Sequence, residues 1–295
     1  ALVAALLAAA DMLAMFGEKQ VAAYLRDTAD TWNDNIEPWT YVTGTELAGQ
    51  LGIEGYYVRI APPNVGETPT LEDDVILIKN VASQADTLSE KIVSPDALAL
   101  VRFGLRRADD PRILNTVKAI DALLKVDTPA GELWHRYNHD GYGEHADGSP
   151  FNGTGIGRGW ALLTGERAHY ELAAGNKDRA AKLLSDMGNF SNEGGMIPEQ
   201  IWDSEDIPER ELFFGKPAGS AMPLVWAHSE YMKICRSMHD EAVFDTPIQT
   251  RQRYMLQDRH SNLDFWRFGR KLTAISRRKK LRIEALAPFS LHWTK

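Results

Sequence analysis

The sequence has a single cysteine, a deficit of positive charge and no long hydrophobic run. Cys235 has no second thiol to pair with, which excludes an internal disulfide and a zinc site built from several thiolates. With 33 Lys and Arg against 41 Asp and Glu the net charge is −8, so the chain repels phosphate backbones on average. No uncharged apolar stretch reaches the ~18 residues that a bilayer span needs. We therefore expect no nucleic acid and no membrane as partner.

The sequence does contain enough apolar residues for a sizeable core, since 44% of its 295 residues are hydrophobic. These residues recur at helical spacing in seven places. Ser94-Pro95 and Asp110-Pro111 are N-cap pairs, whereas Gly17 and Gly175 stand where helices should stop. The predicted helices are Leu2–Phe16, Glu18–Ile36, Pro95–Arg106, Pro111–Leu124, Ile156–Ala174, Lys177–Phe190 and Ala218–Ser237.

The first of these stretches is apolar enough to suggest the core of a signal peptide. Ala1–Ala10 has no basic segment before it, and its pattern continues to Phe16 without a processing boundary. We therefore expect a buried helix, and a chain that begins in mid-helix is expected to be a fragment.

Three connections between the predicted helices are long and rich in Gly, aromatic and acidic residues. They cover Trp39–Pro69, Thr128–Gly155 and Ser191–Gly219. Long loops are uncommon in compact domains and tend to carry function, so the chemistry is expected there. Consecutive helix pairs indicate either a solenoid or a closed toroid of helices, and the toroid is favoured because it gathers such loops at one end.

The composition changes after Gln249. Between Arg251 and Arg282 eleven Lys or Arg stand against two Asp, and Leu263–Phe268 and Leu281–Leu291 alternate as strands do. We expect a helical body over residues 1–249 and a basic, β-rich tail over 250–295 that packs on it. The cluster Arg277–Lys280 has no interleaved aromatic residues, so we interpret it as a solvated turn.

The segment Trp134–Glu144 combines aromatic rings, a guanidinium and carboxylates within eleven residues. Rings of sugars stack on aromatic side chains, while groups such as Arg136 bind hydroxyls with directed hydrogen bonds. The pattern therefore favours a sugar site, with a loop folded on its own aromatic residues as the alternative. A calcium site is a minor alternative, because the spacing of Asp140, Glu144 and Asp147 departs from the EF-hand pattern.

A second segment, Asn192–Asp203, has the features of a rigid loop that holds a general base in a fixed position. Gly194-Gly195 gives a tight turn, and Pro198 holds the chain in a stiff extended stretch, so that Glu199 lies on a fixed platform beside Trp202. A solvated acidic loop is the alternative on composition alone.

Three segments of the sequence are similar to a known protein family. Tyr137–Glu144, Gly153–Gly175 and Met196–Asp203 resemble bacterial glucoamylases and glucodextranases of glycoside hydrolase family 15, and the similarity extends to Leu291-His292-Trp293. The resemblance implies an (α/α)6 toroid that hydrolyses α-glucosidic bonds from non-reducing ends with inversion. That reaction uses two carboxyls, one protonating the leaving oxygen and one activating water.

The resemblance also implies roles for individual residues. Glu199 matches the general base, and Arg136 matches the arginine that holds the terminal glucose. The expected substrate-binding residues are Trp134, Arg136, Tyr137, Glu144 and Gln200. Trp160 lies in an apolar stretch and is expected in the core before the site. The expected partner is an α-glucan or maltooligosaccharide, with no cofactor and no metal, and an extracytoplasmic location follows from the resemblance only.

The sequence departs from the family pattern in one important respect. The general acid of the family lies in a Trp-Glu-Glu segment just upstream of the helix that Ala1–Phe16 resembles, and no Trp-Glu-Glu occurs in this chain. The Arg-Asp pair of the family's earlier half is also missing, and seven helices are about half of the twelve in the toroid. We therefore expect the C-terminal half of such a domain, with little activity by itself.

Half a toroid would expose an apolar face that a missing N-terminal half or another chain would cover. The alternatives are a non-catalytic carbohydrate-binding remnant, one part of a split enzyme, and an α-solenoid that binds proteins. A replacement acid is a further alternative, either Glu144 or an acid between Glu193 and Asp206.

Overall fold

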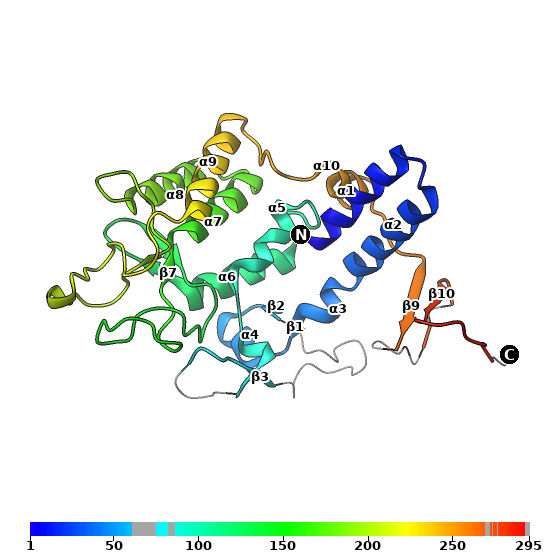
Figure 1. Ribbon diagram of the computed structural model, residues 1–295, viewed down its shortest axis with the longest axis horizontal. Coiled ribbons are helices and arrows are strands. Elements are labelled where there is room, and N and C mark those ends of the chain that lie inside the picture. Colours follow the sequence, from blue (N-terminus) through cyan, green and yellow to red (C-terminus); the bar gives the residue numbers. More distant parts are fainter. Residues whose placement is uncertain (61–74, 82–85, 269–271, 273, 276, 293–295) are drawn as a thin grey trace.

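The computed structural model describes residues 1–60, 75–81, 86–268, 272, 274–275 and 277–292, and it is mostly helical (Figure 1). The α7, α8 and α9 helices lie together at one end, α1 and α2 lie side by side at the other, and α5 and α6 lie between them. The longer helices are α1 (Leu2–Met15), α2 (Lys19–Asp34), α6 (Pro111–Leu124), α7 (Ala161–Ala173), α8 (Lys177–Asn189) and α9 (Val225–His239). The shorter helices are α3 (Ile36–Thr40), α4 (Glu46–Leu51), η1 (Ser89–Lys91), η2 (Pro95–Leu98), α5 (Ala99–Arg102), η3 (Pro208–Arg210), α10 (Ile248–Thr250) and the π-helical η4 (Arg251–Leu256).

The predicted N-caps and stops are confirmed. The Ser94 hydroxyl accepts a hydrogen bond from the Asp96 N–H, and η2 and then α5 follow it. Asp110 caps α6 in the same way through the N–H of Arg112. Gly17 and Gly175 follow α1 and α7 with φ of +84°, a conformation that glycine adopts without steric cost.

Two helices begin later than predicted. The expectation of a helix from Ile156 is wrong, because Gly159–Trp160 forms a strand and α7 begins at Ala161. The expectation of a helix from Ala218 is also wrong, because α9 begins at Val225, after Pro223. A proline disfavours helical backbone in the residue before it, so the helix does not extend back through Met222.

A four-stranded antiparallel sheet crosses the helical body, so the all-α expectation is corrected to a mostly helical fold with small sheets. Its strands are only two or three residues long, which is too short for an alternating pattern to be visible in the sequence. Trp134 pairs with Trp160, which in turn pairs with Gln200. In order the strands are β5 (Lys125–Asp127), β6 (Glu132–Trp134), β7 (Gly159–Trp160) and β8 (Gln200–Ile201).

The predicted loop Trp39–Pro69 is structured over its described part, because β1 (Tyr41–Thr43) and β2 (Gly55–Tyr57) flank α4 and pair in an antiparallel manner. Residues 61–69 of that loop lie outside the described residues. A further antiparallel pair joins β3 (Val75–Leu77) to β4 (Asp86–Leu88).

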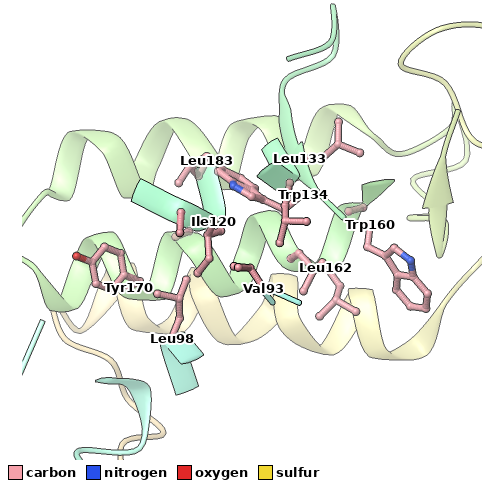
Figure 2. Packing of buried hydrophobic residues seen from close by; sticks show 14 of the residues in the cluster. Val93, Leu98, Ile120, Leu133, Trp134, Trp160, Leu162, Tyr170 and Leu183 are labelled. Atoms are coloured by element: carbon pink, nitrogen blue, oxygen red, sulfur yellow. The ribbon is translucent and has the colours of Figure 1, made fainter. Parts of the chain in front are cut away.

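The main core lies between α6, α7, α8 and the four-stranded sheet (Figure 2). The indole of Trp134 packs among Leu183, Leu133 and Ile120, whereas the ring of Trp160 points outward at the edge of the cluster. Trp160 is buried in this cluster, as expected, but it also lines a cavity beside Arg136, so it belongs to the core and to the candidate site. Burial of such large rings contributes ~25 cal/mol per Å² of apolar surface removed from water.

The α1 helix is buried along one face only. Val3 and Leu7 pack in a second core cluster with Leu105 and other residues, whereas Met15 and Phe16 are 85% and 80% exposed. The expectation of a buried helix is therefore confirmed for one face of α1.

The C-terminal segment contacts α2. Two strands, β9 (Leu263–Arg267) and β10 (Lys280–Glu284), pair in parallel, so the predicted strand Leu281–Leu291 ends earlier than expected. Arg282 Nη2 lies 2.9 Å from the Asp27 carboxylate, and Arg253 pairs with the buried Asp30. Of the predicted basic turn, Arg277 and Arg278 are exposed in a turn, as expected. Trp293 lies outside the described residues, and none of the described helices is long and apolar enough to cross a membrane.

Candidate active site

The four-stranded sheet brings three distant segments together. Arg136 follows β6 by two residues, Trp160 ends β7, and Glu199 directly precedes β8. Because Trp134 pairs with Trp160 and Trp160 pairs with Gln200, the three segments lie side by side in the sheet. Segments separated by more than sixty positions in the sequence are thereby neighbours in the structure.

Glu199 is held by the backbone on both sides of it. Its N–H donates to the carbonyl of Ala221 at 2.9 Å, and the N–H of Gln200 donates to the Ser220 hydroxyl at 2.9 Å. The hydroxyl of Tyr142 donates to Glu199 Oε2 at 3.4 Å. Burial and then the Glu199 carboxylate raise the pKa of Tyr142 above its ordinary value, so the phenol stays protonated and remains a donor.

Glu199 lines a cavity of 580 Å³ together with Glu144, Gln200 and Tyr142. The amide of Gln200 donates to the carbonyl of Tyr142 at 2.7 Å, which fixes one wall of the cavity. Glu144 is 7% exposed, and its Oε2 has no hydrogen-bond partner in the part of the chain that the structure describes. A Cβ at Gly219 would lie 2.8 Å from Glu144 Oε1, so the absence of a side chain there leaves room for this carboxylate.

Arg136 is fixed by a bidentate pair with Asp140, whose side chain is 1% exposed. Its Nε and Nη2 donate to the two carboxylate oxygens of Asp140 at 2.7 and 2.9 Å. The guanidinium carbon lies 4.9 Å from the ring centroid of Tyr142 and 5.0 Å from that of Trp160. Burial opposes the charge, but the Asp140 carboxylate outweighs it and raises the pKa of Arg136. The guanidinium is thus a permanently charged, rigidly placed donor.

A second cavity, of 160 Å³, adjoins this guanidinium. Arg136, Tyr137 and Trp160 line it, and we call it the Arg136 cavity. Across it Arg59 lies over the ring of Tyr137, with 4.1 Å between the guanidinium carbon and the ring centroid. Its remaining lining residues are Asp96, Leu162, Leu163, Glu166 and Trp226.

The predicted site residues fall into three groups. Glu199, Glu144 and Gln200 line the larger cavity, and Arg136 and Tyr137 line the Arg136 cavity. The expectation of a single cleft in which Glu199 lies with Trp134, Arg136 and Tyr137 is corrected, because Glu199 lines a different cavity from Arg136 and Tyr137. The indole of Trp134 is 1% exposed in the core, and its N–H donates to Asp121 at 2.9 Å. Leu133 and Trp134 of β6 are buried and precede Arg136 in the chain. Trp134 therefore anchors the strand that leads to Arg136 and does not line the cavity.

Sequence reasoning missed several residues of the site. Tyr142 and Asp140 belong to the family-like segment Tyr137–Glu144, so a signal for them was present but unassigned. Glu166 lies within the family-like segment Gly153–Gly175 and was likewise given no role. Nothing in the sequence distinguished Arg59, Asp96 or Trp226.

The acidic residues around Glu199 are not uniformly solvated. Asp203 is buried and lies 3.0 Å from Arg158 and 2.8 Å from His135. Burial favours its neutral form, but His135 and Arg158 outweigh burial and lower the pKa of Asp203. By contrast Glu193 is exposed. The interpretation of a wholly solvated acidic loop is therefore wrong for Asp203.

The residues of the minor calcium alternative do not converge. Both carboxylate oxygens of Asp140 are occupied by Arg136, and Asp147 accepts hydrogen bonds from Ser149. Within the described ranges no group of three or more His, Cys, Asp or Glu is arranged to hold a metal ion.

Comparison with known proteins identifies the class to which this fold and site belong. Residues 1–236 match the family described as Glycosyl hydrolases family 15, and the chain belongs to this family of glycoside hydrolases. It is 42% identical over 253 residues to the glucoamylase of Clostridium sp. (strain G0005), a match that covers 86% of this chain and 33% of that protein.

The structure also resembles a solved member of the class. It matches the crystal structure of a bacterial glucoamylase complexed with acarbose with a TM-score of 0.75 at 39% identity, covering 86% of this chain and 34% of that one. The chain thus spans about a third of the length of the relatives it matches.

Proposed function

We propose that this chain carries part of the active site of an inverting, exo-acting glycoside hydrolase that releases glucose from α-glucans, with Glu199 as the general base. The observation that supports this most is the position of the Glu199 carboxylate, which lines a cavity and accepts a hydrogen bond from Tyr142. In the inverting reaction such a carboxylate removes a proton from the water that attacks the anomeric carbon.

The substrate contacts follow from the same geometry. Arg136 and Tyr137 bind the terminal glucose, the guanidinium through hydroxyl oxygens and the phenol through its ring and hydroxyl. Glu144 and Gln200 contact the sugar from the larger cavity. The complex of a related glucoamylase with acarbose supports an oligosaccharide of glucose-like units as the ligand class.

We further propose that residues 1–249 form the C-terminal half of an (α/α)6 toroid, with residues 250–295 as a tail on it. The proton donor and the remaining helices then come from outside these residues. Strongly exposed apolar side chains on α1 and α9, among them Met15, Val225 and Met232, support this because monomers rarely leave large apolar surfaces uncovered. A second polypeptide segment packed on both helices would bury them.

Two proteins test the proposal: this chain alone, and a fusion that supplies the remaining catalytic-domain residues of the Clostridium glucoamylase. We call the second the fusion enzyme. We expect the chain alone to bind maltose without releasing glucose, since a general acid typically contributes ~10²- to 10⁴-fold in rate. The fusion enzyme is expected to release β-glucose from maltooligosaccharides.

The outcomes separate the candidates. Binding without turnover in both proteins would favour a non-catalytic carbohydrate-binding remnant. Activity restored by adding the remaining segment as a separate chain would identify a split enzyme. Robust release of β-glucose by the chain alone, abolished by Glu144→Gln, would show that Glu144 serves as a replacement acid.

A further inference from the structure

One carboxylate in the site has no role in the proposed reaction. Glu166 lies on the second turn of α7, six residues after Trp160, and lines the Arg136 cavity. Its neighbour Arg167 faces elsewhere, towards Glu171 and Asp121. Glu166 is therefore the carboxylate that α7 presents to the cavity.

Glu166 has no hydrogen-bond or ion-pair partner among the residues that the structure describes, although the side chain is largely enclosed. Two of the nearby cations, Arg102 and Arg136, are engaged by other carboxylates, and Arg59 lies over the ring of Tyr137. Arg102 binds Glu230 through two hydrogen bonds of 2.7 and 3.1 Å and also pairs with Asp245. Arg136 is held by Asp140. An enclosed carboxylate without a partner is unfavourable, and such groups cluster at functional sites.

The charges around Glu166 confirm that the protein does not neutralise it. Burial, and then the negative charge of Glu230, raise the pKa of Glu166 to about 7. Arg102 opposes this shift, and the smaller effects of Asp96 and Lys233 act for and against it, respectively. Near neutral pH this carboxyl exists in both forms and can accept or donate a hydrogen bond.

The rest of the cavity defines the class of ligand that fits. Two guanidinium groups, of Arg59 and Arg136, disfavour a cation, and the carboxyls of Glu166 and Asp96 disfavour an anion. The indole N–H of Trp160 is buried and finds no hydrogen-bond partner within the described ranges, which adds an unused donor. The hydroxyl groups of a neutral sugar can donate hydrogen bonds to the carboxyls and accept them from the guanidinium groups, and the sugar ring can lie against Trp160 or Tyr137.

We propose that Glu166 binds a hydroxyl group of the terminal glucose unit inside the Arg136 cavity, as a further substrate-binding residue. This inference rests on the proposed function, because it assigns the sugar of that reaction to this cavity. It names a contact that comes from the helix α7, whereas the other proposed contacts come from the loops that the sheet gathers.

The test is a thermodynamic cycle that combines a substitution of Glu166 with the removal of single hydroxyl groups from the ligand. Binding of glucose and its 2-, 3-, 4- and 6-deoxy analogues to this chain is followed by tryptophan fluorescence, since Trp160 and Trp226 line the cavity. In the wild-type chain, removal of one particular hydroxyl is expected to weaken binding about tenfold, as for a hydrogen bond to a charged group. In Glu166→Gln the same removal is expected to matter less than about threefold.

Two comparisons make the outcome decisive. Asp178→Asn, which alters an exposed carboxylate on α8, is expected to leave all affinities unchanged. Circular dichroism checks that Glu166→Gln is folded. Equal weakening of all five ligands by Glu166→Gln would contradict the hydroxyl contact and leave the proposed function intact. Failure of the wild-type chain to bind either glucose or maltose would contradict both proposals.

Discussion

The hydroxyl of Tyr142 lies 3.4 Å from Glu199 Oε2, and the ring of the same tyrosine lies beneath the guanidinium of Arg136 at 4.9 Å from the guanidinium carbon. Tyr142 therefore joins the proposed general base to the proposed sugar-binding arginine.

Replacement of Tyr142 by Phe separates these two contacts. The ring beneath Arg136 is kept, and only the hydrogen bond to Glu199 is removed. A hydrogen bond to a charged group contributes ~1.5 to 3 kcal/mol, so we expect kcat of the fusion enzyme to fall about tenfold or more with little change in KM. Steady-state kinetics on maltose check this. A fall in affinity with unchanged kcat would instead place Tyr142 in substrate binding.

Replacement of Glu199 by Gln removes the proposed base while keeping the shape of the side chain. We expect kcat of the fusion enzyme to fall by ~10²-fold or more, with a smaller effect on KM, because the base acts on water only in the transition state. Glu193→Gln is the matched control, since Glu193 is an exposed acid of the same loop. A fully active Glu199→Gln variant would remove this residue from the mechanism.

Replacement of Arg136 by Lys keeps the charge but loses the bidentate geometry. Asp140, 1% exposed, would then keep only one good hydrogen bond from position 136. We expect a loss of ~1 to 3 kcal/mol in the free energy of unfolding and at least about tenfold weaker maltose binding. Urea denaturation and fluorescence titration measure the two effects. Unchanged values for both would show that the pair with Asp140 is dispensable.

The pKa of Glu166 predicts how stability changes with pH. The folded value of about 7 lies above the ordinary value of 4.5, so the folded chain binds the proton more tightly than the unfolded chain. The resulting stabilisation is full below pH 4.5 and is lost as the pH rises through 7. Glu166→Gln keeps a neutral side chain at every pH.

We therefore expect Glu166→Gln to be more stable than the wild-type chain by ~1 to 3 kcal/mol at pH 8 and about equally stable at pH 4. Urea denaturation at both pH values checks this. Taken with the predicted loss of sugar binding, the variant would be more stable and less functional. This is expected where a binding site keeps a buried carboxylate that lowers the stability of the fold. A variant less stable than wild type at pH 8 would show that Glu166 has a stabilising partner.

The helices were predictable where their signals are local. The α6 helix begins at Pro111 and ends at Leu124 as predicted, because Asp110 caps it through a residue two positions away. The start of α7 was not predictable, since Trp160 is extended through pairing with Trp134 and with Gln200, which are 26 residues earlier and forty residues later in the chain. Tertiary pairing there overrides the apolar spacing of the segment.

The site was predictable to a similar degree. The segments that contain Glu199, Arg136 and Glu144 could be found from their residue types and order. The burial of Trp134 could not, because it depends on packing against Leu183 and on a hydrogen bond to Asp121. That Glu166 lacks an ion-pair partner among the described residues could not be predicted either. It depends on Arg102 binding Glu230, a contact between residues 128 positions apart.

The pairing of β6, β7 and β8 has a practical consequence for redesign. The insertion between Trp134 and Gly159 starts and finishes on adjacent strands, so a foreign loop spliced between these two residues would have its ends held at the same separation. The strands themselves tolerate fewer substitutions than the loop, since a Cβ at Gly159 would lie 1.9 Å from Leu133 Cδ1. The same segment also carries Arg136, Tyr142 and Glu144, so an exchange that retains the proposed sugar site is confined to the part of the loop after Glu144.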